Sequence, residues 1–487
     1  MTHNPVVRVV LNSGATFATQ AMSLASGFLL SVLVARALGV EALGDYSLAM
    51  ATGGTLVFIA DWGVGLWLTR EIARRQSMDE LLLDRAAGLS LMLGLVVVMT
   101  TMLATRALGF STSVQSAATW AGAYFGLAGL VAVFAAGFVG GERMHLQTIE
   151  MAIERGVGLL AGIVGIFVLK SVNAVFAALF VGRLLGLAWA WSLNWREKRL
   201  ILPRYSYPVW IALLATGTPF AINILMSNLY IQADQLMLGV WSTPADVGLY
   251  RAATSLVVPL AIVAASLNQS LFPRMSIAGR NDLGSLRSIT DISSRAVFVV
   301  GVFFGATIAA LAPFLVADVF GPAFASASVL LIVLSPVIGL RFINNTFGSA
   351  LTASDNQTSR TRLVTLAAIL NVAMNVYAIP RFGPMGAAAT TVLTELGIFV
   401  GCIRALGKKV AYTVAWSKLG AVVLAGLALV IVSRALTPVL GRWIAALVGA
   451  LVFWLAIWIA RVFSAAQRET LRRLLELIVG DNTRVDG

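Results

Sequence analysis

Four charged side chains interrupt long apolar stretches of this chain: Asp61, Arg183, Arg341 and Glu395. A charge at the centre of a membrane helix costs about 2.5–3.5 kcal/mol on insertion scales, so it normally faces a cavity or a partner. Guanidinium groups pair with phosphate oxygens through two hydrogen bonds, so we predict that Arg183 and Arg341 bind an anionic substrate. The two carboxylates would offset this charge or bind a coupling ion, H⁺ or Na⁺. A structural ion pair, or snorkelling of the side chain to the membrane interface, explains each charge equally well.

Two apolar stretches carry polar side chains at the three- and four-residue spacing of one helical face. The first stripe comprises Asn12, Thr16, Thr19 and Ser23, and the second comprises Asn223, Ser227, Tyr230 and Asp234. Such stripes either hydrogen-bond to neighbouring helices or line a water-filled cavity. We predict that both line a substrate cavity, and that Asp234 is a further candidate for ion coupling.

Other charges lie near the outer ends of apolar stretches: Arg36, Asp45, Asp234 and Arg251. Anchoring at the membrane interface is the favoured explanation for this group. Arg36 and Arg251 are in addition candidates for the rim of the substrate cavity.

The elements that must position these residues are membrane helices. The 487 residues are 59% hydrophobic and 12% charged, with a mean hydropathy of +0.88. About fourteen stretches reach the roughly 20 apolar residues that a span requires. They lie near 9–35, 43–69, 86–106, 114–139, 149–169, 172–194, 207–232, 248–272, 294–317, 325–348, 361–379, 385–407, 415–435 and 440–461. We predict an all-α polytopic membrane protein, because uniformly apolar runs of this length are not barrel strands.

Basic residues are distributed unevenly between the two membrane faces. Most of the 35 lysines and arginines fall on the face shared by the two termini. The richest segments are 70–85, 196–204, 274–295, 404–418 and 461–484. By the positive-inside rule both termini are expected to be cytoplasmic, so the net charge of +13 is a topology signal and does not indicate a nucleic-acid partner.

Cysteine and histidine are scarce. Cys402 is the single cysteine, and His3 and His145 are the two histidines, so we expect no disulfide and no histidine-based metal site or other cofactor. The end of the chain, 463–487, is predicted to form an amphipathic helix on the cytoplasmic surface. A partner-binding helix is the alternative for that segment.

Two internal similarities indicate a duplicated six-span unit. Gly44 and Tyr46 correspond to Gly248 and Tyr250, and the segment 169–186 corresponds to 380–397. We therefore expect two parallel six-helix lobes, 1–205 and 206–410, followed by a pair of helices in 411–462. Prolines fall within spans of the second half only, so kinks are expected there: Pro219, Pro259, Pro313 and Pro336.

Several phrases, in order along the first twelve spans, resemble one family of transporters. They are ARALGVEALGDYSLA (35–49), LTREIAR (68–74), DVGLYRAA (246–253), SLFPRMS (270–276), VFGPAFASASVLLIVL (319–334) and NVAMNVYAIPRFGPMGAAATTVLTELG (371–397). Together these phrases resemble the polysaccharide transporter family, the Wzx-type O-antigen and exopolysaccharide flippases of the MATE-like flippase superfamily.

The resemblance implies a V-shaped fold of two lobes around a cationic cavity. It implies transport of an undecaprenyl-pyrophosphate-linked oligosaccharide across the bacterial plasma membrane by alternating access. The partners would be that lipid-linked glycan and membrane lipids, with polysaccharide polymerase or chain-length machinery as further candidates. No covalent chemistry is required, so the protein is not expected to be an enzyme.

Two other functions stay open at the level of sequence. A multidrug or cation antiporter of the same fold would favour an acidic cavity. A membrane-embedded glycosyltransferase or glycan polymerase would need catalytic residues on a sizeable outer loop, and the connection around 232–247 offers only Asp234 and Asp246.

Overall fold

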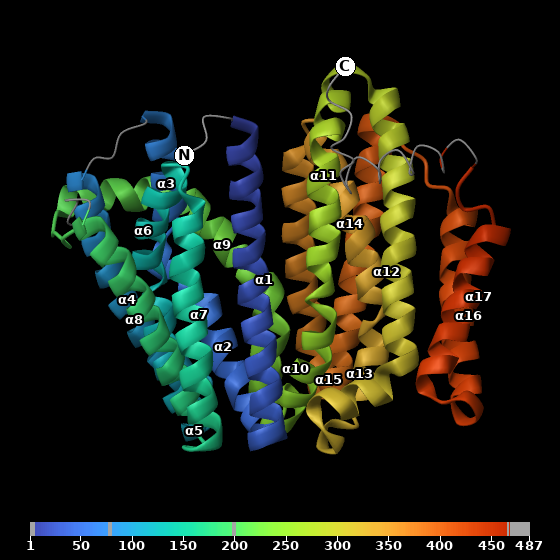
Figure 1. The fold of residues 1–487 in the computed structure, drawn as a ribbon, viewed down its shortest axis with the longest axis horizontal. Helices are drawn as coiled ribbons and strands as arrows, with labels where there is room; N and C mark the ends of the chain where they lie inside the picture. Colours follow the sequence, from blue (N-terminus) through green and yellow to red (C-terminus); the bar gives the residue numbers. More distant parts are fainter. Residues whose placement is uncertain (1–4, 76–79, 197–200, 465–466, 468–487) are drawn as a thin grey trace. The chain divides into compact units, whose positions relative to one another are not determined.

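The architecture is entirely helical in the part of the chain described by the computed structural model. That part comprises residues 5–464 except 76–79 and 197–200, together with residue 467 (Figure 1). No strand occurs within these residues. The predicted amphipathic helix at 463–487 lies almost wholly outside them, so it stays a prediction.

The helices follow the apolar stretches of the sequence. Eleven helices in the described residues are long and apolar enough to cross a membrane. The count differs from fourteen for three physical reasons. One helix, α15 (Gln357–Val410), contains two expected stretches joined at a kink. The stretch 248–272 is divided between α10 (Pro244–Val257) and α11 (Leu260–Asn281), and α7 (Met144–Phe167) carries charge within 149–169. Every expected stretch is nevertheless helical, so the all-α polytopic class is confirmed and the number of spans is approximate.

The first of two compact units comprises residues 1–252. Its helices are α1 (Pro5–Leu38), α2 (Val40–Asp61), α3 (Val64–Arg75), α4 (Glu80–Ala107), α5 (Thr112–Gly126), α6 (Ala128–Gly140), α7, α8 (Val172–Arg196), α9 (Tyr207–Trp241) and the start of α10. This unit extends to residue 252 because α9 packs against α2, α3 and α4, and the lobe boundaries at 205 and 410 stay predictions. The irregular connection before α9 is fixed to α4 by Asp84, whose Oδ1 accepts from the Leu202 amide at 2.8 Å.

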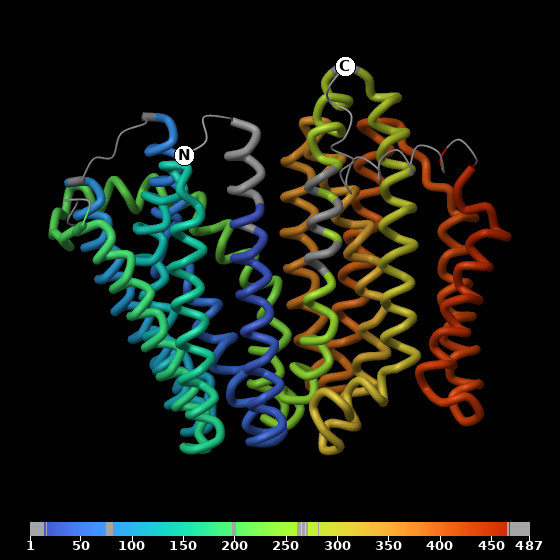
Figure 2. The backbone as a smooth tube through the Cα atoms, viewed as in Figure 1, coloured from blue at the N-terminus to red at the C-terminus, as the bar shows by residue number. Residues whose placement is uncertain are grey.

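The second unit comprises residues 253–487. It contains α11, α12 (Leu283–Phe320), the 3₁₀ turn η1 (Pro322–Phe324), α13 (Ala327–Leu334), α14 (Pro336–Ala353), α15, α16 (Trp416–Leu440) and α17 (Arg442–Ile459). The long α12 packs against α11, α14 and α16, and α16 and α17 form a hairpin (Figure 2). α15 reverses at Gly383, whose φ of 53° and ψ of −135° lie outside the helical region and favour glycine.

Breaks occur in both halves of the chain, with and without proline. Pro219 and Pro313 lie inside α9 and α12, whereas Pro259 and Pro336 stand at the beginnings of α11 and α14. In the first half the break between α2 and α3 falls at Trp62 and Gly63, which adopt φ values of 46° and 74°. The first half thus has a helix break without proline, whereas α9 and α12 continue through Pro219 and Pro313.

The repeated Gly-x-Tyr sequence forms a reciprocal helix crossing within the first unit. A Cβ on Gly44 of α2 would lie 1.9 Å from the Pro244 carbonyl oxygen of α10. A Cβ on Gly248 of α10 would lie 2.1 Å from the Val40 carbonyl oxygen of α2. Because no side chain fits in either gap, both glycines are needed for the backbones to approach this closely. The sequence similarity therefore corresponds to a physical contact between the two copies.

Candidate functional site

A buried ion pair occupies the centre of the first unit. Arg183 on α8 donates from Nε to Glu154 Oε2 at 3.1 Å and from Nη2 to Glu154 Oε1 at 3.0 Å. Arg183 also donates to the carbonyl oxygen and the hydroxyl of Tyr124 on α5, both at 2.8 Å. Its guanidinium carbon lies 3.7 Å from the centre of the Tyr124 ring. All three nitrogens of the guanidinium are engaged, so this pair holds α5, α7 and α8 together.

Glycines on α8 provide the space for these carboxylates. A Cβ on Gly182 would lie 2.4 Å from the Glu154 carbonyl oxygen, and a Cβ on Gly186 would lie 3.0 Å from Glu150 Oε1. Glu150 is only 4% exposed, and its Oε1 accepts no hydrogen bond from the described residues. The Glu154 carboxylate also lies 3.6 Å from Arg155 Nε. Two carboxylates and two guanidinium groups are thus concentrated in the middle of α7 and α8.

A second ion pair lies in the second unit. Arg341 on α14 donates from Nε to Glu395 Oε1 on α15 at 2.7 Å. Asn344, one turn after Arg341, donates from Nδ2 to Glu395 Oε2 and to the Glu395 carbonyl oxygen, both at 3.0 Å. The Glu395 side chain is 3% exposed, whereas that of Arg341 is 27% exposed. This guanidinium therefore remains accessible from one side while its carboxylate is enclosed.

The structure thus pairs each predicted substrate arginine with a glutamate. The two arginines lie in different units and have different surroundings. Arg183 is enclosed and fully engaged, which suits a structural role. Arg341 is partly exposed, which suits contact with an anionic ligand, and Glu395 is its structural counterion. Neither assignment to substrate is tested by these contacts, so both stay predictions.

The first polar stripe packs against α7 where it is described. Thr19 shares a 3.0 Å hydrogen bond with Thr148 of α7 and donates to its own helix at the Ala15 carbonyl oxygen. Asn12 and Thr16 belong to α1, but their side chains lie outside the described residues. In the described part, the stripe therefore joins two helices.

The second stripe on α9 has a different environment. Asn223 and Ser227 are exposed, and Tyr230 is half-buried. Asp234, at the end of the stripe, is buried, and its Oδ2 accepts from the Tyr250 hydroxyl of α10 at 2.8 Å. Asn223 and Ser227 are thus accessible, whereas Asp234 joins α9 to α10.

The remaining predicted charges include one helix cap and one interhelical contact. Asp61 Oδ1 accepts from the Gly65 amide at 2.9 Å where α2 ends and α3 begins. Arg251 donates from Nη2 to Ser31 Oγ of α1 at 3.4 Å, and Arg36 is exposed near the end of α1. Capping and helix linkage account for the first two contacts without any ion, and ion coupling by Asp61 stays a prediction.

One buried polar network was not anticipated from the sequence. Asn371 donates to the Thr394 hydroxyl at 3.2 Å, Asn375 donates to Asn371 Oδ1 at 3.1 Å, and the Thr390 hydroxyl donates to Asn375 Oδ1. All four side chains are buried. The network joins the two halves of α15 across the kink at Gly383. The sequence does carry a signal for it, because Asn371 and Asn375, and likewise Thr390 and Thr394, are four residues apart on either side of the segment 380–384, which contains proline and glycine.

Comparison with known proteins defines the class. The family described as "Polysaccharide biosynthesis protein" matches residues 9–278, which is more than half of the chain. The chain therefore belongs to the polysaccharide biosynthesis protein family, as the sequence phrases predicted.

Two relatives in Haloferax volcanii have more specific names. The chain is 23% identical over 376 residues to "Probable low-salt glycan biosynthesis flippase Agl15", covering 75% of this chain and 77% of that protein. It is 27% identical over 186 residues to "Probable flippase AglR", covering 37% of this chain and 39% of that protein.

Solved structures share the fold. The lipid II flippase MurJ in an inward closed conformation matches with a TM-score of 0.73 and 15% identity, over 93% of this chain and 99% of MurJ. An inward-facing multidrug resistance transporter of the MATE family matches with a TM-score of 0.64 and 17% identity, over 80% of this chain and 95% of that protein. At these identities the likeness establishes the fold alone, that of a multi-pass bundle of membrane helices.

Proposed function

We propose that this protein is a flippase that moves a polyprenyl-pyrophosphate-linked oligosaccharide across the membrane. The observation that carries the proposal is membership of the polysaccharide biosynthesis family on a fold shared with the lipid II flippase. The name of the Agl15 relative supports the same activity. Our proposal includes undecaprenyl as the lipid, an O-antigen or exopolysaccharide unit as the glycan, and a bacterial plasma membrane with both termini cytoplasmic.

The chemistry of the proposed transport needs binding and movement but no covalent step. The partly exposed Arg341 is the residue we assign to the pyrophosphate, because guanidinium and phosphate oxygens form charge-assisted hydrogen bonds. The exposed Asn223 and Ser227 on α9 are suited to sugar hydroxyl groups. The polyprenyl chain would remain in lipid while alternating access moves the headgroup from one leaflet to the other.

The test is the leaflet location of the lipid-linked oligosaccharide in cells depleted of this protein. We expect the intact lipid-linked glycan to accumulate on the cytoplasmic side and surface polysaccharide to be lost. Re-expression of the wild-type chain should restore both. Normal arrival of the glycan at the outer leaflet in depleted cells would contradict the flippase proposal.

A second candidate is a cation antiporter of the same fold. It is favoured by the likeness to the MATE transporter and by Glu150, whose buried Oε1 accepts no hydrogen bond from the described residues. The purified protein in vesicles would then bind an organic cation such as ethidium in competition with H⁺ or Na⁺. The flippase proposal predicts no such binding.

A further inference from the structure

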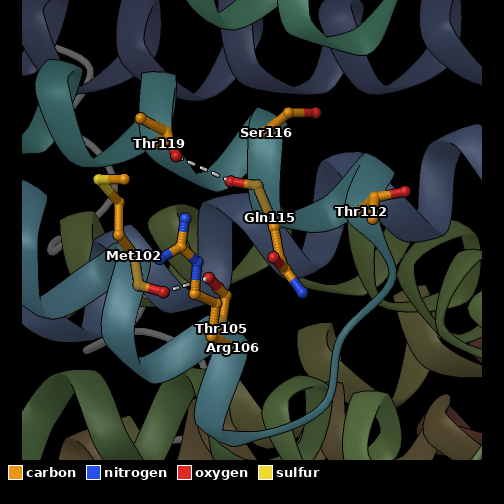
Figure 3. Close-up of a pocket in the computed structure, with 7 residues that line it drawn as sticks. All are labelled: Met102, Thr105, Arg106, Thr112, Gln115, Ser116 and Thr119. Atoms are coloured by element: carbon orange, nitrogen blue, oxygen red, sulfur yellow. Dashed lines mark hydrogen bonds between the residues drawn. The ribbon is translucent and has the colours of Figure 1, made fainter.

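A polar pocket lies between the end of α4 and the beginning of α5 in the first unit. Its volume is about 220 Å³. The lining is drawn in Figure 3 and comprises Met102, Thr105, Arg106, Thr112, Gln115, Ser116 and Thr119. None of these residues was singled out from the sequence, and none belongs to the ion pairs described above.

The pocket combines one cation with several hydrogen-bond acceptors. Arg106 is exposed, and its guanidinium rises from α4 toward the turn of α5 that carries Gln115 (Figure 3). Within the described part of the chain, this guanidinium makes no hydrogen bond or ion pair, so all five of its N–H donors are available. A ligand for this group must carry negative charge.

Two oxygens beside Arg106 can only accept a hydrogen bond from a ligand: the Thr119 hydroxyl has used its hydrogen, and the amide oxygen of Gln115 carries none. The Thr119 hydroxyl donates to the Gln115 carbonyl oxygen at 2.9 Å, and Gln115 Nε2 donates to the Phe110 carbonyl oxygen at 2.7 Å. The Thr119 oxygen and Gln115 Oε1 therefore face a ligand as acceptors and require hydroxyl donors. The pocket accordingly suits a phosphate group that is joined to a polyol.

An apolar surface continues from the pocket along α4. Leu95, Met99 and Leu103 are 70%, 57% and 59% exposed and lie at four-residue spacing on one face, ahead of Arg106. Trp120 on α5 is 42% exposed beside Thr119 in the sequence. Exposed apolar side chains on a membrane helix face acyl chains, so the polar pocket lies at the end of a lipid-facing surface.

We propose that this pocket binds the headgroup of an anionic phospholipid whose headgroup carries hydroxyl groups, of the phosphatidylglycerol type. The phosphate contacts Arg106, the glycerol hydroxyls donate to Thr119 and Gln115, and the acyl chains follow Leu95, Met99 and Leu103. Phosphatidylcholine has no donor for the two oxygens. Phosphatidylethanolamine places an ammonium group beside a guanidinium. The inference does not depend on the flippase proposal, because it concerns a lipid bound from the bilayer.

The test is a lipid titration of the purified full-length protein, followed by native mass spectrometry. The lipids are phosphatidylglycerol, phosphatidylethanolamine and phosphatidylcholine with identical acyl chains. We expect the wild-type protein to bind phosphatidylglycerol most tightly. Arg106→Gln should weaken that binding about tenfold, the loss of one hydrogen bond to a charged group, and leave phosphatidylcholine binding unchanged. Arg106→Lys should retain part of the preference.

The matched control is Lys170→Gln, which removes one positive charge from another exposed position of the same unit. Because Arg106 is exposed, its variants should melt at the wild-type temperature. An equal loss of phosphatidylglycerol affinity in Lys170→Gln and Arg106→Gln would show that only the net charge of the protein matters, and it would overturn the proposal. Competition by free glycerol 3-phosphate as effective as that by the lipid would also overturn it, because the site would then belong to a soluble phosphate.

Discussion

The two units contain the same kind of ion pair in opposite arrangements. In the first unit the arginine lies on α8 and the glutamate on α7, whereas in the second the arginine lies on α14 and the glutamate on the second half of α15. By the internal repeat Arg183 corresponds to Thr394, so Glu395 lies one residue after the position that matches Arg183 and carries the opposite charge. The side chain of Arg183 is 9% exposed and that of Arg341 is 27% exposed. The presence of a charge within an apolar helix therefore does not show whether the residue is structural or binds a ligand. The exposure of the side chain and its hydrogen-bond partners separate the two cases.

The largest expected effect is the loss of the enclosed pair. Glu154→Gln leaves the buried Arg183 without its counterion, so the free energy of unfolding should fall by about 3–5 kcal/mol. Thermal melting of the purified protein in detergent would measure this loss. The double variant Arg183→Met with Glu154→Leu should recover part of the stability, because it removes both charges. Unchanged melting of the single variant would contradict the structural role.

The next largest effect is expected where Gly182 lets α8 approach α7 beside the Arg183–Glu154 pair. Gly182→Ala places a Cβ 2.4 Å from the Glu154 carbonyl oxygen and should separate α7 from α8. Overpacking of this kind costs about 1–3 kcal/mol. Melting should therefore fall, and the Tyr124 environment should change in near-ultraviolet circular dichroism. A variant with wild-type melting and spectrum would show that the two helices are not held this closely.

A smaller loss of stability is expected for the open pair, together with a larger loss of activity. Arg341→Gln removes a partly exposed guanidinium and should cost about 1.5 kcal/mol, the lower value for a hydrogen bond to a charged group. If Arg341 binds the pyrophosphate, export of the lipid-linked glycan should fall strongly while membrane levels stay normal. Export and immunoblotting of membranes would be measured together. Wild-type export would remove Arg341 from the binding site and leave its pairing with Glu395 as its role.

The smallest effect should have the opposite sign. Gly397→Ala, two residues after Glu395, meets nothing within 4 Å. The replacement should stabilise α15 by up to about 1 kcal/mol, because alanine favours helix over glycine. It is thus the counterpart in the second unit of Gly182→Ala. If the melting temperature of Gly397→Ala fell as that of Gly182→Ala is expected to fall, Gly397 would be in close contact with atoms outside the described residues, and the prediction would be wrong.

Hydropathy was sufficient to predict the helices, because spans are set by bilayer thickness and backbone hydrogen bonding. The partners of the charged residues were not predictable in the same way. Glu154 and Arg183 are 29 residues apart, and Arg341 and Glu395 are 54 apart, so only helix packing brings each pair together. Glu150 and Glu154 were visible at i, i+4 spacing, but the sequence does not indicate which neighbouring helix they face.

The reciprocal crossing of α2 and α10 has a consequence for the origin of the chain. Val40 contacts Gly248, and Gly44 contacts Pro244. In the internal repeat Gly44 corresponds to Gly248, and at the same offset Val40 corresponds to Pro244, so the two contacts are equivalent with the two helices exchanged. Contacts exchanged in this way are characteristic of two identical chains related by a two-fold axis. The crossing thus has the form of a homodimer interface, which gene duplication and fusion would have retained inside a single polypeptide.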